Sequence, residues 1–201
     1  LGDFGVGKST FVKQALKPKK PKADGDKRGG YAHDVRSLMI KDDDKGWIDV
    51  SLDIYDTNGD EEFATLQKDY YAKAHGGIVM YDLTKKSSFD NAELWVKENL
   101  RFSERNSQCV MFILGTNKDK VEKDSRKRVV SHKNLQDILM QGLHMTKLGE
   151  ISTMKKDDVD KVLVEVAYSL TNTFPHRIKS SSIYEAEIAS KEKASCGCTI
   201  I

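Results

Sequence analysis

The chain has 201 residues, of which 38% are hydrophobic, and this suits one α/β domain with a packed core and a tail. Charged residues make up 32%, yet the formal net charge is only +2, which argues against a dedicated nucleic-acid-binding protein. No apolar run is long enough to cross a membrane, and the three cysteines form no evident disulfide framework, so a reducing, cytosolic setting is expected.

The first predicted element is a phosphate-binding loop. Residues 2–9 fit the pattern G-x-x-x-x-G-K-[ST], in which backbone N–H groups of a glycine-rich turn surround a phosphate. Lys8 can place its charge between the outer phosphates, and the Ser9 hydroxyl can bind Mg²⁺. A plain glycine-rich turn ahead of a helix is the alternative. The candidate nucleotide-binding residues of this loop are Gly2, Asp3, Phe4, Gly5, Val6, Gly7, Lys8, Ser9 and Thr10.

A phosphate loop of this kind normally follows a buried strand, but only Leu1 precedes it here. We therefore expect the sheet to lack most of its first strand. The neighbouring strands would then lose hydrogen-bond partners, a defect that could prevent stable folding.

The remaining elements alternate along the chain. Strands are expected at 31–40, 47–55, 76–82, 109–114 and 144–151, and helices at 8–17, 61–73, 87–105, 130–141 and 157–170. On the long helix expected at 87–105, Leu94 and Trp95 are expected to face inward. Alternating strands and helices predict a mostly parallel central sheet with helices on both faces.

Three further motifs lie at expected strand ends, where an open α/β sheet binds its ligand. Asp56 can hold Mg²⁺ opposite Ser9, and the Gly59 N–H can bind a terminal phosphate. The Asp119 carboxylate can accept two N–H bonds from guanine, and a backbone N–H in the segment 150–154 can bond the guanine O6. The candidate residues of these loops are Asp56, Gly59, Thr116, Asn117, Asp119, Ser152, Thr153 and Met154.

Together these motifs resemble those of Ras-superfamily small GTPases, which are P-loop NTPases, and most closely those of the Rab branch. Residues 56–63 match the family pattern D-T-A-G-Q-E-x-[FY], and residues 70–84, followed by Ser88-Phe89, resemble a Rab segment in which Tyr-Tyr precedes a buried strand. The resemblance covers about residues 1–170 and is weakest at 17–46. It implies a small G domain at 1–172, GTP or GDP with Mg²⁺ as ligands, and GTP hydrolysis to GDP and phosphate. Exchange factors, GTPase-activating proteins and effectors would bind the switch regions. Nucleic acid is not an expected partner.

Departures from the family pattern predict impaired catalysis. The water-positioning glutamine beside Gly59 is Asp60 here, whose shorter, negative side chain reaches the water poorly and repels phosphate. Phe4 replaces a small phosphate-loop residue and would crowd the attacking water. The switch-one threonine has Gly30 in its place. We expect slow hydrolysis and poor discrimination between GTP and GDP.

The guanine-binding motif also departs from its pattern. In one register, N-K-x-D becomes Thr116-Asn117-Lys118-Asp119, and the asparagine lacks the aliphatic stem of the usual lysine. In the other register Lys120 replaces the essential aspartate. The first register is preferred because guanine binding requires Asp119.

From residue 173 the apolar period is lost, which predicts a flexible hypervariable tail at 173–201. Cys198-Thr-Ile-Ile201 fits a prenylation signal, and the Cys196–Cys198 pair resembles Rab tails that carry two prenyl groups. A thiol end without function is the alternative. Lipid chains would place the protein on the cytoplasmic face of endomembranes or the plasma membrane, with a cytosolic pool.

The sequence thus predicts a Rab-like, membrane-anchored switch in vesicle trafficking with weak GTP hydrolysis. A non-cycling guanine-nucleotide-binding scaffold is the alternative, favoured by Asp60, Phe4 and Gly30. A P-loop kinase or ATPase is a third possibility, which Asp119 argues against.

Overall fold

The sheet at the centre of the molecule is mostly parallel. The structure is a computed structural model that describes residues 1–16, 33–42, 46–57, 74–103, 109–140, 145–175, 178–180 and 193–200. The strands in this part are β1 (His33–Asp42), β2 (Gly46–Tyr55), β3 (Gly76–Asp82), β4 (Val110–Thr116), β5 (Met145–Glu150), β6 (Ile178–Ser180) and β7 (Lys193–Ile200). They lie in the order β1-β2-β7-β3-β4-β5, with β6 paired to β7. Among the strands of the described residues, only the β1–β2 and β6–β7 pairs are antiparallel.

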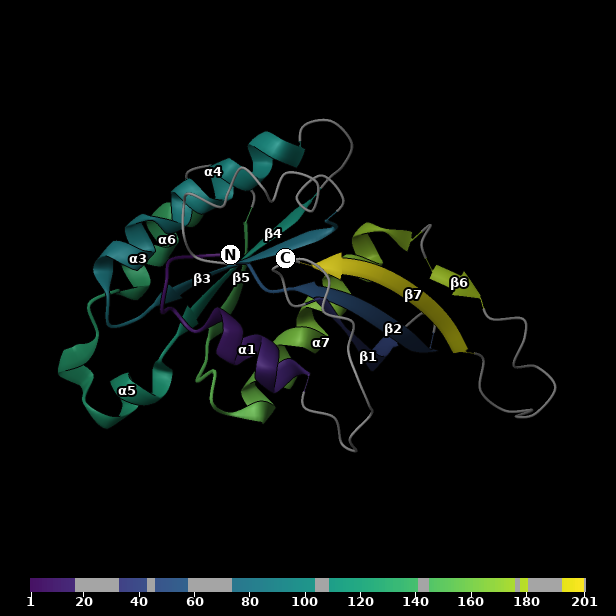
Figure 1. The fold of residues 1–201 in the computed structure, drawn as a ribbon, viewed down its shortest axis with the longest axis horizontal. Coiled ribbons are helices and arrows are strands. Elements are labelled where there is room, and N and C mark those ends of the chain that lie inside the picture. Colours follow the sequence, from purple (N-terminus) through teal and green to yellow (C-terminus); the bar gives the residue numbers. More distant parts are fainter. Residues whose placement is uncertain are drawn as a thin grey trace.

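Helices cover both faces of this sheet, as the sequence predicts (Figure 1). They are α1 (Lys8–Ala15), α3 (Lys86–Asp90), α4 (Ala92–Ser103), α5 (Lys118–Lys123), α6 (His132–Met140) and α7 (Lys156–Thr173), with a short 3-10 turn at Ser125–Lys127. Buried side chains of α1 and α7 pack in one hydrophobic cluster, and those of α3, α4 and α6 pack in a second. The two clusters lie on opposite faces of the sheet.

The central strand β3 connects the two clusters because its side chains alternate between the faces of the sheet. Ile78 and Met80 belong to the cluster of α1 and α7, whereas Val79 and Tyr81 belong to the cluster of α4 and α6. Every residue of β3 is buried. A continuous apolar run is typical of a parallel strand covered on both sides, which is why the sequence locates this strand without error.

The helix expected at 87–105 is two helices, α3 and α4, separated at Asn91. Trp95 is buried, as predicted, with 7% of its surface exposed, but the prediction for Leu94 is wrong because 59% of that residue is exposed. Neighbouring helical residues point about 100° apart. The buried stripe of α4 runs through Ala92, Trp95, Val96 and Asn99 and leaves Leu94 outside it.

The end of the chain contains structure that the sequence does not predict. Residues 178–180 and 193–200 lie in the region expected to be a flexible tail, and they form β6 and β7. Strand β7 takes a central place between β2 and β3, where the sequence predicts a missing strand. The loop at 17–30 and the helix at 61–73 lie outside the described residues. Among the described helices, none combines the length and apolar character needed to span a bilayer.

Candidate nucleotide-binding site

The phosphate loop connects Leu1, beside β3, to the start of α1, and a side chain at two of its glycines would crowd neighbouring atoms. Gly2 has φ +128°, and a Cβ there would lie 2.3 Å from the carbonyl oxygen of Met80. Gly7 has φ +105°, and a Cβ there would lie 3.2 Å from Thr153 Oγ1. The glycines therefore let the loop pack against β3 and against the 152–154 segment while adopting a left-handed backbone.

Lys8 lies within the curve of this loop and is buried, with 8% of its surface exposed. Its Nζ donates hydrogen bonds to the carbonyl oxygens of Gly2, at 2.6 Å, and Asp3, at 2.8 Å. Burial lowers the pKa of Lys8, while the carboxylates of Asp56 and Asp3 act in the opposite direction. Because an ammonium group has three N–H donors, one remains for a phosphate oxygen.

Asp3 attaches the loop to α4. Its Oδ2 accepts a hydrogen bond from Asn91 Nδ2 at 3.0 Å, and its Oδ1 accepts one from Trp95 Nε1 at 2.9 Å. Two donors, one at the junction of α3 and α4 and one within α4, fix the carboxylate at the side of the loop. Sequence reasoning places Asp3 in the loop but gives no signal for these partners.

The two predicted magnesium ligands come from two different parts of the fold. Ser9 is exposed in the first turn of α1, and Asp56 comes directly after β2. Within the described residues, the buried Asp56 Oδ1 has no hydrogen-bond partner, and Asp56 lines a small cavity with Lys8 and Thr57. An unpaired carboxylate oxygen and an exposed hydroxyl fit Mg²⁺, which prefers oxygen ligands and keeps several waters or phosphate oxygens.

Thr116, at the end of β4, ties the phosphate loop to the sheet. Its hydroxyl lies 2.7 Å from the carbonyl oxygen of Val6 and 2.9 Å from that of Tyr81. The next residue, Asn117, has a left-handed backbone with φ 59° and precedes α5. Asp119 lies in the first turn of α5.

The segment 152–154 lies beside the same loop. The Ser152 N–H donates to Asp158 Oδ2 at 3.1 Å, which fixes the start of α7. Gln14 Nε2 of α1 donates to the carbonyl oxygen of Met154 at 3.1 Å. The loop after β4 is tied to this segment as well, because the Lys118 N–H bonds the carbonyl oxygen of Ile151 at 3.1 Å. Three of the predicted loops are thereby brought together.

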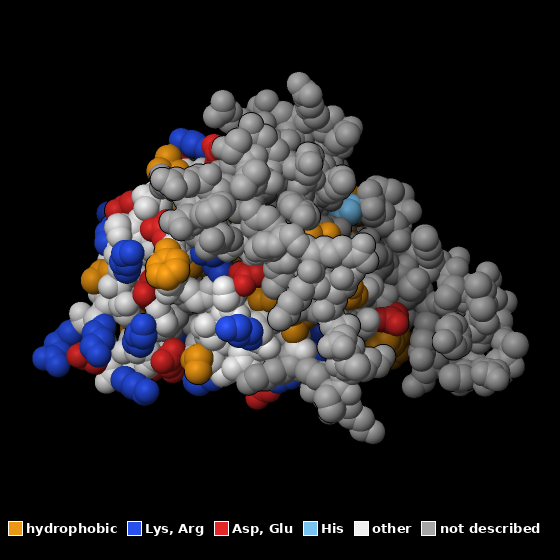
Figure 2. Space-filling view, in the orientation of Figure 1, with side chains coloured by type: hydrophobic (Ala, Val, Ile, Leu, Met, Phe, Trp, Pro, Cys, Tyr) orange, Lys and Arg blue, Asp and Glu red, His pale blue; other side chains and the backbone are white. Residues whose placement is uncertain are grey.

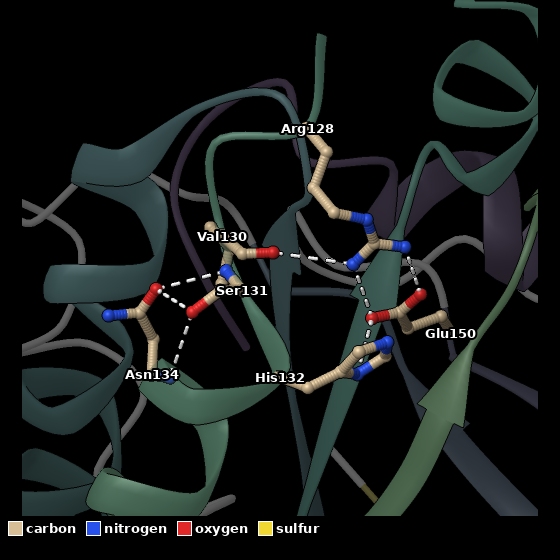
Figure 3. Close-up of polar contacts among 6 residues, drawn as sticks. All are labelled: Arg128, Val130, Ser131, His132, Asn134 and Glu150. Carbon is tan, nitrogen blue, oxygen red and sulfur yellow. Dashed lines mark hydrogen bonds and ion pairs between the residues drawn. The ribbon is translucent and has the colours of Figure 1, made fainter. Parts of the chain in front are cut away.

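An ion pair that the sequence does not reveal holds the end of β5, two residues before Ser152. Arg128 forms a two-pronged pair with Glu150, with Nη1–Oε1 and Nη2–Oε2 distances of 2.8 and 2.6 Å (Figure 3). Nη1 also donates to the carbonyl oxygen of Val130 at 3.3 Å, and His132 Nδ1 lies 3.7 Å from Glu150 Oε1. The hydrogen bonds from Arg128 are the main reason why the pKa of Glu150 lies below its ordinary value.

Comparison with known proteins assigns this fold and these loops to a family. The model of the Ras family matches residues 1–172. The chain belongs to the Ras family. It is a Rab-like small GTPase, 31% identical over 172 residues to the Ras-related protein Rab-19 of Rattus norvegicus, with 85% of this chain and 72% of that protein covered. It is 29% identical over 175 residues to the Ras-related protein RABC2a of Arabidopsis thaliana, with 85% and 75% covered.

In this Rab-like GTPase, the structure describes the predicted site residues of the phosphate loop, Asp56 and the two guanine-binding loops. Gly59, Asp60 and Gly30 lie outside the described residues. Phe4 is 78% exposed at the tip of the phosphate loop, and Met154 is 68% exposed. Around α5 the surface carries charges of both signs (Figure 2), among them the pairs Lys118–Glu122 and Lys155–Glu122.

Proposed function

We propose that this Rab-like GTPase binds GDP and GTP with Mg²⁺ and acts as a membrane-anchored switch in vesicle trafficking, with weak GTP hydrolysis. The arrangement of Lys8 supports nucleotide binding most directly. The glycine loop holds its ammonium group with two backbone carbonyl oxygens and leaves one N–H for a phosphate. The start of α1 adds backbone N–H groups and the positive end of the helix dipole.

Mg²⁺ would be held by the Ser9 hydroxyl and by Asp56, directly or through water, together with phosphate oxygens. Bound there, the cation would neutralise charge that develops on the outer phosphates. Lys8 binds the same phosphates as a point charge. Asp3, held by Asn91 and Trp95, would support the loop from the side of α4.

Guanine would be recognised by the loops at Thr116–Asp119 and Ser152–Met154. Asp119 supplies the carboxylate for two base N–H groups. Asp158 already binds the Ser152 N–H, so the following N–H groups, of Thr153 and Met154, are the candidates for the guanine O6. The Lys118–Ile151 hydrogen bond keeps the two loops in contact.

Weak hydrolysis is supported by the side chains around the expected attacking water. Phe4 exposes its ring at the tip of the loop, where it would crowd that water and any arginine finger. Asp60 replaces the glutamine that positions the water. Single-turnover assays should therefore show a slow rate that increases in the double variant Phe4→Gly, Asp60→Gln. Binding with no hydrolysis in either protein would instead favour the non-cycling scaffold.

Nucleotide binding is tested by calorimetry with GDP and GTP, with and without Mg²⁺. Lys8→Ala should abolish the binding heat, whereas Lys13→Ala, an exposed lysine on the same helix, should leave it unchanged. An excess of ATP should fail to compete. The proposal is wrong if the purified chain binds neither nucleotide, or if Lys8→Ala binds as well as the parent.

Membrane attachment would use prenyl groups on Cys198 and Cys196, each joined through a thioether bond with loss of diphosphate and the thiol proton. Mass spectrometry of the protein isolated from cells tests this modification directly. Unmodified Cys198 in every preparation would contradict it.

A further inference from the structure

A single side chain of α1 reaches the segment that is expected to bind guanine. Gln14, in the last turn of α1, is buried, with 8% of its surface exposed. Its Nε2 donates a hydrogen bond to the carbonyl oxygen of Met154 at 3.1 Å, across 140 positions of sequence. Because α1 begins directly after the phosphate loop, this bond joins the phosphate-binding and base-binding parts of the site.

A second contact between the same elements runs in the opposite direction. Lys156, the first residue of α7, donates from Nζ to the carbonyl oxygen of Gln14 at 3.4 Å and to Asp160 Oδ1 at 3.1 Å. The two helices pack on the same face of the sheet (Figure 1). Gln14 therefore donates to the segment before α7 and accepts from the start of that helix, so the two elements are joined at two points.

The segment that Gln14 contacts is a turn. The Lys155 N–H donates to the Ser152 carbonyl oxygen at 3.0 Å. The peptide group between Met154 and Lys155 is therefore held at both polar ends, its N–H by Ser152 and its C=O by Gln14. A peptide group is planar, so these two bonds fix its orientation. The N–H groups proposed for the guanine O6 belong to Thr153 and Met154, the two central residues of this turn.

The other contacts of the turn do not replace the bond from Gln14. The Ser152 N–H donates to Asp158 Oδ2 at 3.1 Å, and Thr153 lies against Gly7, where an added Cβ would come within 3.2 Å of its Oγ1. Both contacts hold the first half of the turn. In the second half, Met154 is largely exposed, so packing contributes little there and the hydrogen bond carries the restraint.

We propose that Gln14 is a positioning residue for guanine: it orients the turn whose N–H groups bind O6 and fixes that turn at a set distance from the phosphate loop. It acts through the Met154 carbonyl and not by contact with the nucleotide. The inference rests on the proposed function, because it concerns the base of the same nucleotide. Loss of the Gln14 amide should weaken the hydrogen bonds to O6 and leave the contacts of Lys8 and Mg²⁺ with the phosphates in place.

The test compares Gln14→Met with the parent, in the full-length chain with Mg²⁺, by competition of three nucleotides against a fluorescent GDP derivative. Methionine keeps the length of the side chain and removes the donor. GDP and inosine diphosphate both carry O6, and the affinity for each should fall about 5- to 10-fold, as expected for one lost hydrogen bond. The diphosphate of 2-aminopurine riboside lacks O6, so its affinity should change by less than about 2-fold.

Lys13→Met is the matched control, because Lys13 is an exposed neighbour on the same helix, and it should leave all three affinities unchanged. Equal weakening of all three nucleotides by Gln14→Met would show that Gln14 only stabilises the fold, and an unchanged affinity for GDP would show that the turn is held without it. Either result overturns the inference. Gln14→Asn, which keeps the amide on a shorter side chain, is measured in the same way if the methionine variant does not fold. A parent chain that binds neither GDP nor GTP would refute the proposed function and this inference together, which distinguishes that failure from the other two.

Discussion

Trp95 Nε1 donates a 2.9 Å hydrogen bond to Asp3 Oδ1, which joins α4 to the phosphate loop across 92 positions of sequence. Most of the Trp95 ring is buried among the side chains under α4, so the indole N–H is aimed at the loop by the packing of the helix. The loop is thus held by the fold itself, before any nucleotide is bound. A preorganised loop loses less conformational entropy when a phosphate binds.

Trp95→Phe should destabilise the protein and weaken GDP binding. The change removes the N–H while keeping an aromatic ring, and a hydrogen bond to a charged group contributes about 1.5–3 kcal/mol. Asn91 still holds the other carboxylate oxygen, so we expect a loss near the low end of that range in urea unfolding. Leu94→Ala is the matched control, because that neighbouring side chain is 59% exposed, and its effect should stay within about 0.5 kcal/mol. Equal effects of the two variants would show that the hydrogen bond contributes nothing.

Thr116→Val tests the contact between β4 and the phosphate loop. Valine keeps the shape of threonine but leaves the buried carbonyl oxygen of Val6 without this donor, which we expect to cost about 1–3 kcal/mol and to weaken nucleotide binding. Thr116→Ser keeps the hydroxyl and loses one methyl group, so stability should fall by about 1 kcal/mol with nucleotide affinity retained. Chemical denaturation and calorimetry on both variants separate the two contributions. If serine weakens binding as much as valine does, packing and not the hydroxyl holds the loop.

The elements that the sequence predicts well are those whose signal is local. The run at 76–82 begins with two glycines, is apolar at Ile78–Met80, and is β3; the glycine loop and the strand-end motifs are equally local. Helix α5 is missed because Val121 is its only buried residue, so it has no apolar period. Leu94 is assigned wrongly because an apolar neighbour of a buried residue does not itself lie on the buried stripe.

The features that sequence reasoning misses depend on partners far away along the chain. Thr116 bonds Val6 across 110 positions, and Arg128 bonds Glu150 across 22. Strand β7 is the clearest case, because Cys198 and Ile200 give little strand signal by themselves. It pairs with β2 and β3, which lie far from it along the chain, and no local pattern in the sequence indicates those partners.

Gly2→Ala and Gly5→Ala should have very different effects, although both positions lie in the same motif. A Cβ at Gly2 would come within 2.3 Å of the Met80 carbonyl oxygen, so the loop or β3 must move, and we expect loss of nucleotide binding and of several kcal/mol of stability. At Gly5, with φ +81°, no atom lies within 4 Å of the added Cβ, and only the left-handed backbone costs about 1–2 kcal/mol. Thermal unfolding and GDP titration check both. Similar behaviour of the two variants would contradict the steric account.

The Arg128–Glu150 pair should make stability depend on pH in the acid range. The hydrogen bonds from Arg128 hold the pKa of Glu150 below its ordinary value of 4.5 in the folded state. The unfolded chain therefore binds more protons between these two pKa values, and the stabilisation is present above about pH 4.5 and is lost as the pH falls through the folded pKa. One carboxyl group can contribute a slope of at most about 1.4 kcal/mol per pH unit.

Urea unfolding of the parent, Glu150→Gln, Arg128→Gln and the double variant, between pH 3 and 6, isolates this contribution from that of other carboxyl groups. We expect each single variant to flatten the dependence below about pH 4.5, and the double variant to flatten it no further, because either change removes the same interaction. His132, 3.7 Å from Glu150 Oε1, adds attraction only when protonated, so His132→Gln should reduce the slope slightly and leave the pair intact. The assignment to this ion pair is wrong if Arg128→Gln keeps the full acid dependence of the parent.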